Sequence, residues 1–278
     1  MLMSVRSLLA RDVLDYAARF PGPHLGYVLA SITAGNTAAK LWEIGADDAA
    51  SILLLWDQGN NVFTLAGDAA PSSVVGALAD LVSAELRPQA LAQGAPYFRV
   101  HATTQAVTAA LPAIFGGVAL HPHPAYLYVD RGAPLPDAPP KLSGLTLRPI
   151  DRDLLGQDDL AHVEDVRGEI RWMWPSEDRF DAVGFGVAAL IPGAIAGWCT
   201  AEYVGPDACG VGVATAPDYR RAGVATATAV AFLRTARARG LTAYWECSQA
   251  NLASTRLAEK LGLSRCAVED DWAGFFAS

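Results

Sequence analysis

The sequence predicts an α/β protein, an α+β arrangement around a mixed sheet, built in two parts. Residues 131–142 contain four prolines and no apolar periodicity. Because proline fixes φ and removes a backbone donor, neither a helix nor an inner strand can run through this stretch, and we interpret it as a linker. On each side of it the pattern predicts the same order of elements: hairpin, helix, strand, helix, strand. The two halves share almost no residue identities, so this order alone suggests a degenerate internal repeat.

In the first half, β-type runs at residues 50–56 and 62–66 flank the turn Gln58-Gly59-Asn60-Asn61 and predict a hairpin. Apolar residues at helical spacing predict a helix within 72–91. The remaining predicted elements are a strand at 97–101, a helix at 104–115 and a strand at 125–129.

In the second half, residues 185–191 and 195–204 form a predicted hairpin around the turn Pro192-Gly193. A strand at 209–214 and a helix at 224–239 follow. The last predicted elements are a strand at 241–247, a helix at 252–261 and a strand at 263–268.

Composition narrows the class of protein. The chain has 278 residues, is 52% hydrophobic and carries a net charge of −8, which excludes wholesale disorder and disfavours nucleic acid as the main partner. Its apolar runs are far shorter than the ~20 residues of a membrane span, and its start lacks a secretory signal. The four cysteines show no CxxC spacing. We therefore expect a cytoplasmic protein that handles a small molecule, with no membrane partner.

The most informative segment is 211–227, VGVATAPDYRRAGVATA, where a β-type run is followed by a short turn and a helix. The first amides of a helix have no intrahelical acceptor, and the helix dipole adds positive potential there. Small residues let an anion approach that backbone closely. An ordinary turn before a solvated basic helix is the alternative. We predict a phosphate site formed by Arg220, Arg221, Ala222, Gly223, Val224 and Ala225.

The pattern Arg-x-x-Gly-x-Ala, with Pro217 and Tyr219 upstream, resembles motif A of the GNAT N-acetyltransferase superfamily. A second segment agrees, because Asn251 and Ser254 precede a closing Leu261-Gly262 in the family's order. The resemblance covers roughly 142–278 and implies a catalytic GNAT domain there. The whole layout is similar to two-part acetyltransferases, with residues 1–138 as a degenerate GNAT-like domain.

The resemblance implies acetyl-CoA as co-substrate, lying between the fourth and fifth strands of the catalytic domain. By motif position, Val213 and Thr215 would meet the pantetheine amides, and residues 220–225 would hold the pyrophosphate. Asn251 would hydrogen-bond the arm near the thioester, and Ser254 would line the same wall. Asn251 also suits a helix N-cap, and both roles can hold at once.

The predicted catalytic groups are less well defined. Many family members have a tyrosine seven residues after the asparagine, which protonates the departing thiolate, and here this residue is Ala258. The substitutes Tyr203, Tyr219 and Tyr244 are candidates by position type alone. Direct transfer also needs an uncharged amine, so a base must remove its proton. Glu202 and Glu246 are our candidates, and a salt-bridged or solvent-facing strand residue is the alternative for each.

Residues 151–181 hold ten acids and four arginines, with Trp172 and Trp174 among them. An acidic, aromatic wall suits a small cationic amine as acceptor, by Coulomb attraction and cation–π contact. The alternative is a solvated acidic helix pair whose tryptophans belong to the core.

Other motifs point away from metal and dinucleotide chemistry. His121 and His123, between prolines, predict a rigid loop and no metal site. The dinucleotide pattern of an NAD enzyme is missing. A CoA-binding sensor without turnover stays open, because Ala258 permits it. The first half has no counterpart to residues 220–225, so we expect it not to bind CoA and regard its surface as a candidate for homodimer contacts.

Overall fold

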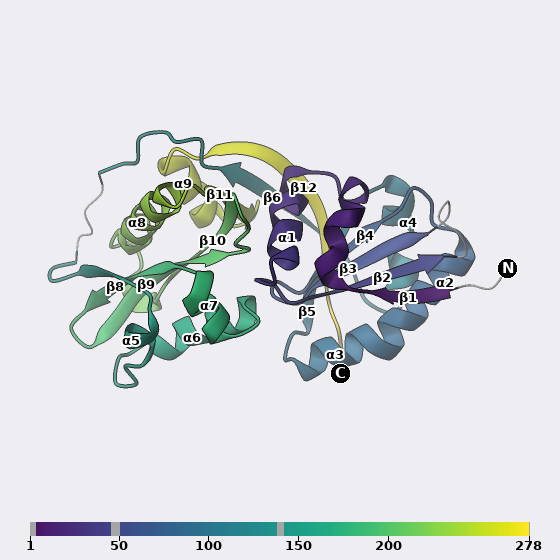
Figure 1. Cartoon of the computed structure of the whole chain (residues 1–278), viewed down its shortest axis with the longest axis horizontal. Helices are drawn as coiled ribbons and strands as arrows, with labels where there is room; N and C mark the ends of the chain where they lie inside the picture. Colours follow the sequence, from purple (N-terminus) through teal and green to yellow (C-terminus); the bar gives the residue numbers. More distant parts are fainter. Residues whose placement is uncertain (1–3, 46–50, 138–141, 278) are drawn as a thin grey trace. The chain divides into compact units, whose positions relative to one another are not determined.

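The computed structural model describes residues 4–45, 51–137 and 142–277 (Figure 1). The chain divides into two compact units. Unit 1 contains residues 1–33, 37–124 and 269–278, and unit 2 contains 34–36 and 125–268. In the middle of the chain, unit 1 ends at Pro124 and unit 2 begins at Ala125. The domain bounds 1–138 and 142–278 remain a prediction. Residues 138–141 of the predicted linker lie outside the described residues.

Unit 1 is a mixed sheet with helices, in the strand order β1-β2-β3-β4-β5-β12, in which β4 and β5 are parallel. All six residues of β3 are buried, as the apolar run ILLLW before Asp57 predicts for an inner strand. The core includes the buried aromatics Trp56, Phe63 and Phe98. The elements are β1 (Ser4–Leu8), η1 (Ala10–Arg19), α1 (Pro23–Thr33), β2 (Ala39–Gly45), β3 (Ile52–Asp57), β4 (Val62–Ala66), α2 (Ser72–Leu81), η3 (Val82–Leu86), α3 (Arg87–Ala92), β5 (Tyr97–Ala102) and α4 (Gln105–Ile114).

Unit 2 has the strand order β6-β11-β10-β9-β8-β7, in which β10 and β11 are parallel. Helices α8 and α9 follow β10 and β11, and α5, α6 and α7 precede β8. The elements of the chain after α4 are β6 (His121–Val129), β7 (Thr146–Pro149), α5 (Arg152–Leu155), α6 (Val163–Met173), α7 (Glu177–Val183), β8 (Gly186–Ile191), β9 (Ala194–Glu202), β10 (Ala208–Thr215), η4 (Pro217–Tyr219), α8 (Val224–Ala238), β11 (Thr242–Ser248), α9 (Leu252–Lys260) and β12 (Ser264–Phe275), whose C-terminal part belongs to unit 1. The predicted mixed α/β class is confirmed.

The last strand of each half leaves its own half. Residues 125–129 of β6 pair antiparallel with β11 in unit 2, whereas residues 272–275 of β12 pair antiparallel with β5 in unit 1. Both halves contain the predicted hairpin, helix, strand, helix and strand in this order, and the second half has the additional strand β10 between its hairpin and α8. The exchange of final strands explains why the compact units do not follow the chain.

Two predicted elements differ from the observed ones. His121–Pro124, predicted as a rigid loop, begins strand β6, but its pairing with β11 starts only at Ala125. Strand β12 runs to Phe275 instead of ending at 268, because its polar middle hides the strand pattern.

The helix predicted within 72–91 is interrupted by a π-helical turn, η3, between α2 and α3. Pro88 lies in the first turn of α3. A proline ring collides with the carbonyl four residues earlier in a regular α-helix, and a wider turn upstream relieves that contact.

Candidate active site

Strands β10 and β11 pair for only part of their length. Their parallel ladder joins 208–210 to 242–244, while β10 continues to Thr215 and β11 to Ser248. Beyond Gly210 and Tyr244, β10 stays bonded to β9 and β11 to β6. Within the described residues, the facing edges of 211–215 and 245–248 therefore do not pair with each other, which leaves backbone donors and acceptors of β10 available to an extended ligand.

The loop after β10 ends in an open helix N-terminus. Arg221 and Gly223 both have left-handed backbones, with φ of 64° and 84°, and Gly223 is the N-cap of the 15-residue helix α8. No side chain caps this helix. In the described chain, the amides of 221–226 donate to no backbone carbonyl. A left-handed arginine is strained, and alternation of this kind turns successive amides towards one point.

Apolar side chains hold this loop in place. Val224 is 1% exposed and belongs to a small cluster with Ala189 and Ala196, against which Tyr219 and Ala222 also pack. Gly197 of β9 lies under the same loop, because a Cβ there would be 2.8 Å from both the Ala214 carbonyl and Val224 Cγ1. The side chains of this loop thus anchor it while its amides have no backbone acceptor among the described residues.

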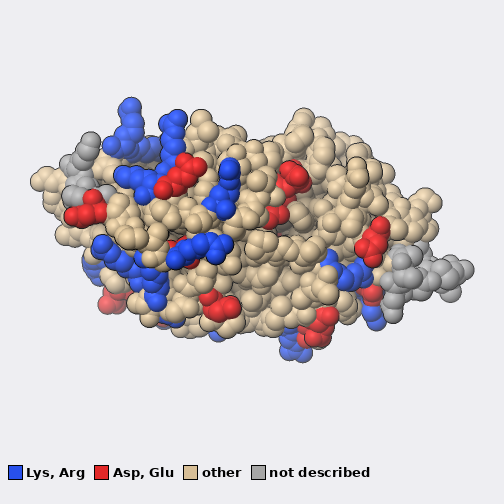
Figure 2. Space-filling model, turned by 90° about the horizontal axis from the view of Figure 1, so that it is seen from above, with Lys and Arg blue, Asp and Glu red and all other residues tan. Residues whose placement is uncertain are grey.

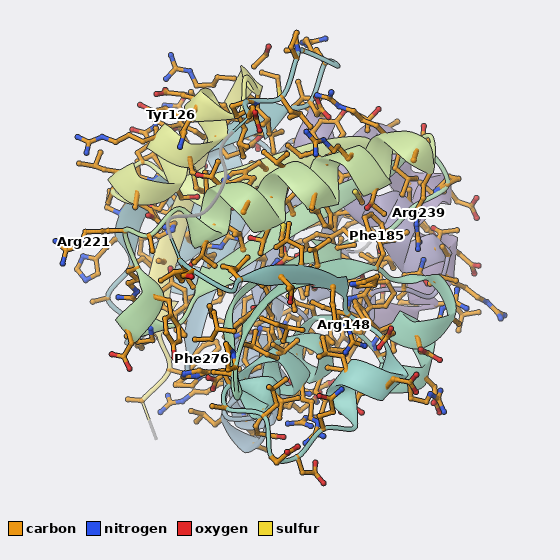
Figure 3. All side chains as sticks on the ribbon, turned by 90° about the vertical axis from the view of Figure 1, so that its left-hand side faces the viewer. Tyr126, Arg148, Phe185, Arg221, Arg239 and Phe276 are labelled. Atoms are coloured by element: carbon orange, nitrogen blue, oxygen red, sulfur yellow. The ribbon has the colours of Figure 1, made fainter. Side chains whose placement is uncertain are left out.

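Positive charge surrounds the N-terminus of α8. Arg220 and Arg221 are exposed, and Figure 3 shows Arg221 reaching away from the ribbon at the opposite end of α8 from Arg239. Lys260 of α9 donates from Nζ to Thr226 Oγ1 at 3.3 Å. Figure 2 shows Lys and Arg side chains gathered over the part of unit 2 that holds α8 and α9. The predicted phosphate residues 220–225 therefore share one positively charged loop.

Val213 and Thr215 lie on the half of β10 that β11 leaves open. They pair with Cys199 and Gly197 of β9, so their side chains share the α8 side of the sheet. Thr215 Oγ1 is buried and has no hydrogen-bond partner in the described chain. Since buried hydroxyls are nearly always bonded, this oxygen is a polar group that a ligand can satisfy.

Asn251 is the N-cap of α9, as its capping alternative predicted. Its Oδ1 accepts a hydrogen bond from the Ser254 amide at 3.1 Å, and the Ser254 hydroxyl accepts one from Trp245 Nε1 at 2.9 Å. The Nδ2 group of Asn251 has no partner among the described residues, and the side chain is exposed. The cap thus leaves that donor available.

Glu202 and Glu246 lie on one face of the sheet. Gly210 pairs with Glu202 across β9 and with Tyr244 across β11, so residues 202, 244 and 246 share a face, opposite to α8. Both carboxylates are half-buried. The sheet therefore brings the two predicted bases to one side of the open strand edge.

Glu169 of α6 is a third carboxylate on this face. Trp198 Nε1 donates to its Oε2 at 2.7 Å, and the Thr200 hydroxyl donates to its Oε1. The sequence prediction included Glu169 only as one of ten acids in a segment. The spacing of Trp198, Thr200 and Glu202 on alternate residues of β9 was the signal for a polar face, but only packing shows that α6 lies against it.

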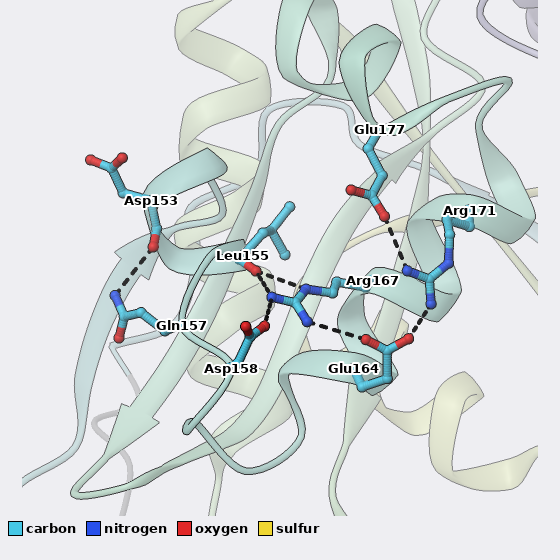
Figure 4. Close-up of polar contacts among 8 residues, drawn as sticks. All are labelled: Asp153, Leu155, Gln157, Asp158, Glu164, Arg167, Arg171 and Glu177. Carbon is cyan, nitrogen blue, oxygen red and sulfur yellow. Dashed lines mark hydrogen bonds and ion pairs between the residues drawn. The ribbon is translucent and has the colours of Figure 1, made fainter.

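Most other acids of 151–181 are bonded to arginines (Figure 4). Arg167 bonds Asp158 and Glu164, and Arg171 bonds Glu164 and Glu177. Hydrogen bonds from Arg171 and Arg167 lower the pKa of Glu164. Similar pairs join Arg152 to Asp178 and Asp181. A cavity of about 420 Å³ between α5, α6 and α7 is lined mostly by these paired groups.

The aromatic candidates occupy different environments. Trp174 is buried and donates from Nε1 to the Ala201 carbonyl at 3.1 Å, as the core alternative required, whereas Trp172 is 43% exposed. Ala258 is fully buried on α9. Tyr203 is buried, and Tyr219 is near the His162 ring. Tyr244, which is half-buried beside Glu246 on the same face, is the tyrosine nearest in strand position to the open edge.

The described residues offer neither a metal cluster nor a membrane span. Among them, no three or more His, Cys, Asp or Glu side chains are grouped to hold a metal ion. None of the helices in those parts is both long and apolar enough to span a bilayer.

Burial raises the pKa of the Cys209 thiol to about 12, with Asp130 adding to the rise and Arg239 opposing it.

Comparison with known proteins shows which family the second half of the chain is similar to. Residues 138–266 match the family model described as GNAT acetyltransferase. Over 122 residues the chain is 30% identical to a Bacillus subtilis (strain 168) protein named "Uncharacterized N-acetyltransferase YdfB". That match covers 43% of this chain and 44% of the relative, so it spans less than half of that protein's length.

Solved structures match over nearly the whole chain. A GCN5-related N-acetyltransferase-like protein from Streptococcus suis 89/1591 has a TM-score of 0.64 at 18% identity, covering 96% of this chain and 100% of that one. A tandem GNAT protein from the clavulanic acid biosynthesis pathway has a TM-score of 0.58 at 14% identity, covering 100% and 99%. At these identities the likeness establishes the fold. Residues 138–266 therefore match the GNAT acetyltransferase family, and over its whole length the chain has a fold like that of a tandem GNAT protein.

Proposed function

We propose that the protein is an acetyl-CoA-dependent N-acetyltransferase that transfers the acetyl group directly to a small amine. The observation that carries this proposal is the continuity between two features of unit 2. The unpaired edge of β10 leads, through η4, into the uncapped N-terminus of α8. A molecule with an amide-bearing arm and a diphosphate can use both at once.

In this proposal the pantetheine arm lies along residues 211–215 of β10, like an added strand. The unpartnered Thr215 hydroxyl and the available Nδ2 of Asn251 support it as polar groups near that path within the described chain. The diphosphate meets the amides of 221–225, whose N-terminal helix dipole favours anions. Arg220 and Arg221 supply charge, and Val224 and Ala222 hold the loop from beneath.

The chemistry makes two demands on the site. The acceptor must lose a proton before it attacks, because an alkylammonium has a pKa of ~10.4 in water and no nucleophilic lone pair. Glu202 and Glu246 are the proposed proton acceptors. The CoA sulfur must then leave, and with Ala258 at the usual tyrosine position it leaves as a thiolate or takes its proton from Tyr244 or from water.

The acceptor is proposed to be a small cationic amine. The ion pairs of α5–α7 occupy many of the acids on which this idea first rested, and Glu164 is among them. Asp165 and Glu169, with the exposed Trp172, remain as its support. If neutral amides at Glu164, Asp165 and Glu169 leave amine turnover unaltered, the cationic acceptor is wrong.

A CoA-binding sensor without turnover is the second candidate. The fully buried Ala258 favours it, because no proton donor can act from that position. Titration with acetyl-CoA followed by a panel of amines separates the two. Binding with amine-stimulated thiol release supports the enzyme, and binding without any turnover supports the sensor.

The binding site itself is tested with two glycines of α8. Gly223 and Gly240 stand at opposite ends of this helix, and both have left-handed backbones, with φ of 84° and 72°. Gly223→Asp places a negative charge where the diphosphate is proposed, and Gly240→Asp is the matched control. Calorimetry should show loss of acetyl-CoA binding in Gly223→Asp and in part in Arg221→Ala, but not in Gly240→Asp. Equal binding by Gly223→Asp and Gly240→Asp would rule out this site.

A further inference from the structure

The hydrogen bonds around Glu169 leave the Thr200 hydroxyl with a fixed direction. Trp198 Nε1 and Thr200 Oγ1 each donate to one oxygen of the Glu169 carboxylate, and these two donor residues are only 6% and 3% exposed. A threonine hydroxyl has one proton and two lone pairs. Because the proton is committed to Glu169, Thr200 can offer only an acceptor to any other neighbour.

The carboxylate of Glu202 lies close to this hydroxyl, because both flank the α-carbon of Gly212 on β10. A Cβ at Gly212 would collide with Glu202 Oε1 and would stand 2.9 Å from Thr200 Oγ1. Both oxygens therefore crowd the same point over the α-carbon of residue 212, where no larger residue fits without moving them. Gly212 lies within the part of β10 that β11 leaves unpaired, so Glu202 is held beside the open strand edge.

We infer that Glu202 is the proton acceptor for the amine, and that Thr200 and Glu169 are positioning residues that prepare it for that role. The inference rests on the proposed function. A neighbour that can only accept hydrogen bonds stabilises the protonated carboxyl group relative to the carboxylate, because only the protonated form can donate to it. Thr200, oriented by Glu169, therefore favours the state that Glu202 reaches on taking the proton.

Protons and electron pairs balance in this reaction. One proton of the acceptor ammonium moves to a Glu202 oxygen, which leaves a lone pair on nitrogen. That pair forms the N–C bond to the thioester carbonyl as the C–S bond breaks and its electrons leave with the CoA sulfur. A second nitrogen proton ends on the thiolate, giving the amide and CoA thiol, and Glu202 later releases its proton to water.

Replacing Glu169 by glutamine reverses the hydrogen bond without emptying the space. The Nε2 group of the introduced glutamine can donate to Thr200 Oγ1, which frees the Thr200 proton to point at Glu202 and stabilise its carboxylate. We expect Glu169→Gln to lower kcat about tenfold and to move the acid limb of the kcat/KM profile to lower pH. A purely structural role for Glu169 would move neither of these selectively.

The test uses the full chain and measures kcat and KM for the best amine of the panel across the acid limb. Glu202→Gln should lose roughly 10²–10⁴ in kcat and its acid limb, as expected for removal of a general base. Gly212→Ala keeps the carboxylate but displaces it, and should lose up to about 100-fold. Thr200→Val should behave like Glu169→Gln in rate, and Thr200→Ser should restore it. Glu177→Gln, an exposed acid of α7 bonded to Arg171, is the control.

Acetyl-CoA binding and the melting temperature are measured for every variant. If Thr200→Val has a folding defect, the inference is judged from Thr200→Ser and Gly212→Ala instead. If the wild type binds acetyl-CoA but acetylates no amine, the proposed function is wrong and this inference falls with it. If the wild type acetylates an amine but Glu169→Gln and Gly212→Ala keep its kcat and pH profile, this inference alone is overturned. It is also overturned if Glu246→Gln, and not Glu202→Gln, removes the acid limb.

Discussion

Replacing Asp130 by asparagine should weaken the fold of unit 2 at the end of strand β6. Arg237 of α8 donates to both carboxylate oxygens of Asp130, with Nε and Nη2 each 2.7 Å from their acceptors. The Gly132 amide donates to Oδ1 at 2.9 Å, and Arg237 also bonds the Ala133 carbonyl. This ion pair ties the chain after β6 to the helix whose N-terminus forms the proposed diphosphate site.

The expected loss of stability is about 3 kcal/mol, the lower end of the range for breaking a buried ion pair. The Asp130 side chain is 5% exposed, so its removal leaves Arg237 without its main partner. Arg237 is itself 30% exposed, and water can compensate part of the loss, which is why the lower end applies. In a domain of this size each kcal/mol shifts the melting temperature by roughly 2–4 °C.

The effect should depend on pH with a defined sign. Burial raises the pKa of Asp130, but hydrogen bonds from Arg237 and Gly132 and the Arg237 charge outweigh it, and the pKa in the folded protein lies below 3.8. A group whose pKa is lowered by folding stabilises the protein above its unfolded value. The contribution is therefore complete at neutral pH and is lost as the pH falls below 3.8 and through the folded pKa.

Urea unfolding followed by tryptophan fluorescence, with calorimetric melting, measures the difference between wild type and Asp130→Asn. Asp153→Asn, an exposed acid on α5, is the matched control and should be neutral. The reasoning is refuted if Asp130→Asn stays within about 1 kcal/mol of wild type at neutral pH, where a buried pair should cost more. It is refuted equally if the difference does not shrink at acid pH.

Three further predictions concern the loop before α8, the strand beneath it and the thiols. A left-handed backbone such as that of Arg221 costs about 1–2 kcal/mol in a non-glycine residue, and Arg221→Gly removes this cost. Arg221→Gly should therefore have a higher melting temperature than Arg221→Ala, although both should bind acetyl-CoA more weakly than wild type. Equal melting temperatures would contradict the backbone strain. Gly197→Ala should destabilise the protein by roughly 1–3 kcal/mol and weaken acetyl-CoA binding, because the added methyl group collides with β10 and α8. Gly168→Ala is the control and should not destabilise the protein, because a Cβ at this position in α6 meets open space. Thermal melts measure the change in stability, and calorimetry measures the change in acetyl-CoA binding. Iodoacetamide should modify the half-buried Cys266 before the buried Cys209, whose pKa is about 12, and peptide mass spectrometry showing the reverse order would refute this.

Local patterns in the sequence predicted most elements of the second half. The turn at Pro192-Gly193, the small residues at 222–225 and the capping type of Asn251 each act through their own backbone or near neighbours, and each is found where predicted. The sequence analysis predicts no element before residue 50, where the structure has β1, η1, α1 and β2. Apolar side chains of β2 are nevertheless buried in the core, and Leu41 and Ile44 are fully buried.

The sheet face that carries Glu202 and Glu246 was only partly predictable from the sequence. Alternation on β9 and β11 placed Glu202 and Glu246 on strands, but not on a common face, because that depends on the register with β10. The acids of 151–181 suggested one negative wall. Arginines three to 29 residues away in sequence pair with five of them, and only the turn of α6 leaves Glu169 facing the sheet.

The sequence by itself determined the mixed α/β fold class, the GNAT resemblance of the second half and the turn that precedes helix α8, because glycine, proline and small residues act on the backbone wherever they stand. Tertiary structure decided which strands exchange between the halves, which carboxylates are paired, and that Gly212 seats Glu202 beside Thr200. These depend on contacts between residues far apart in the chain, and no local pattern encodes such distances.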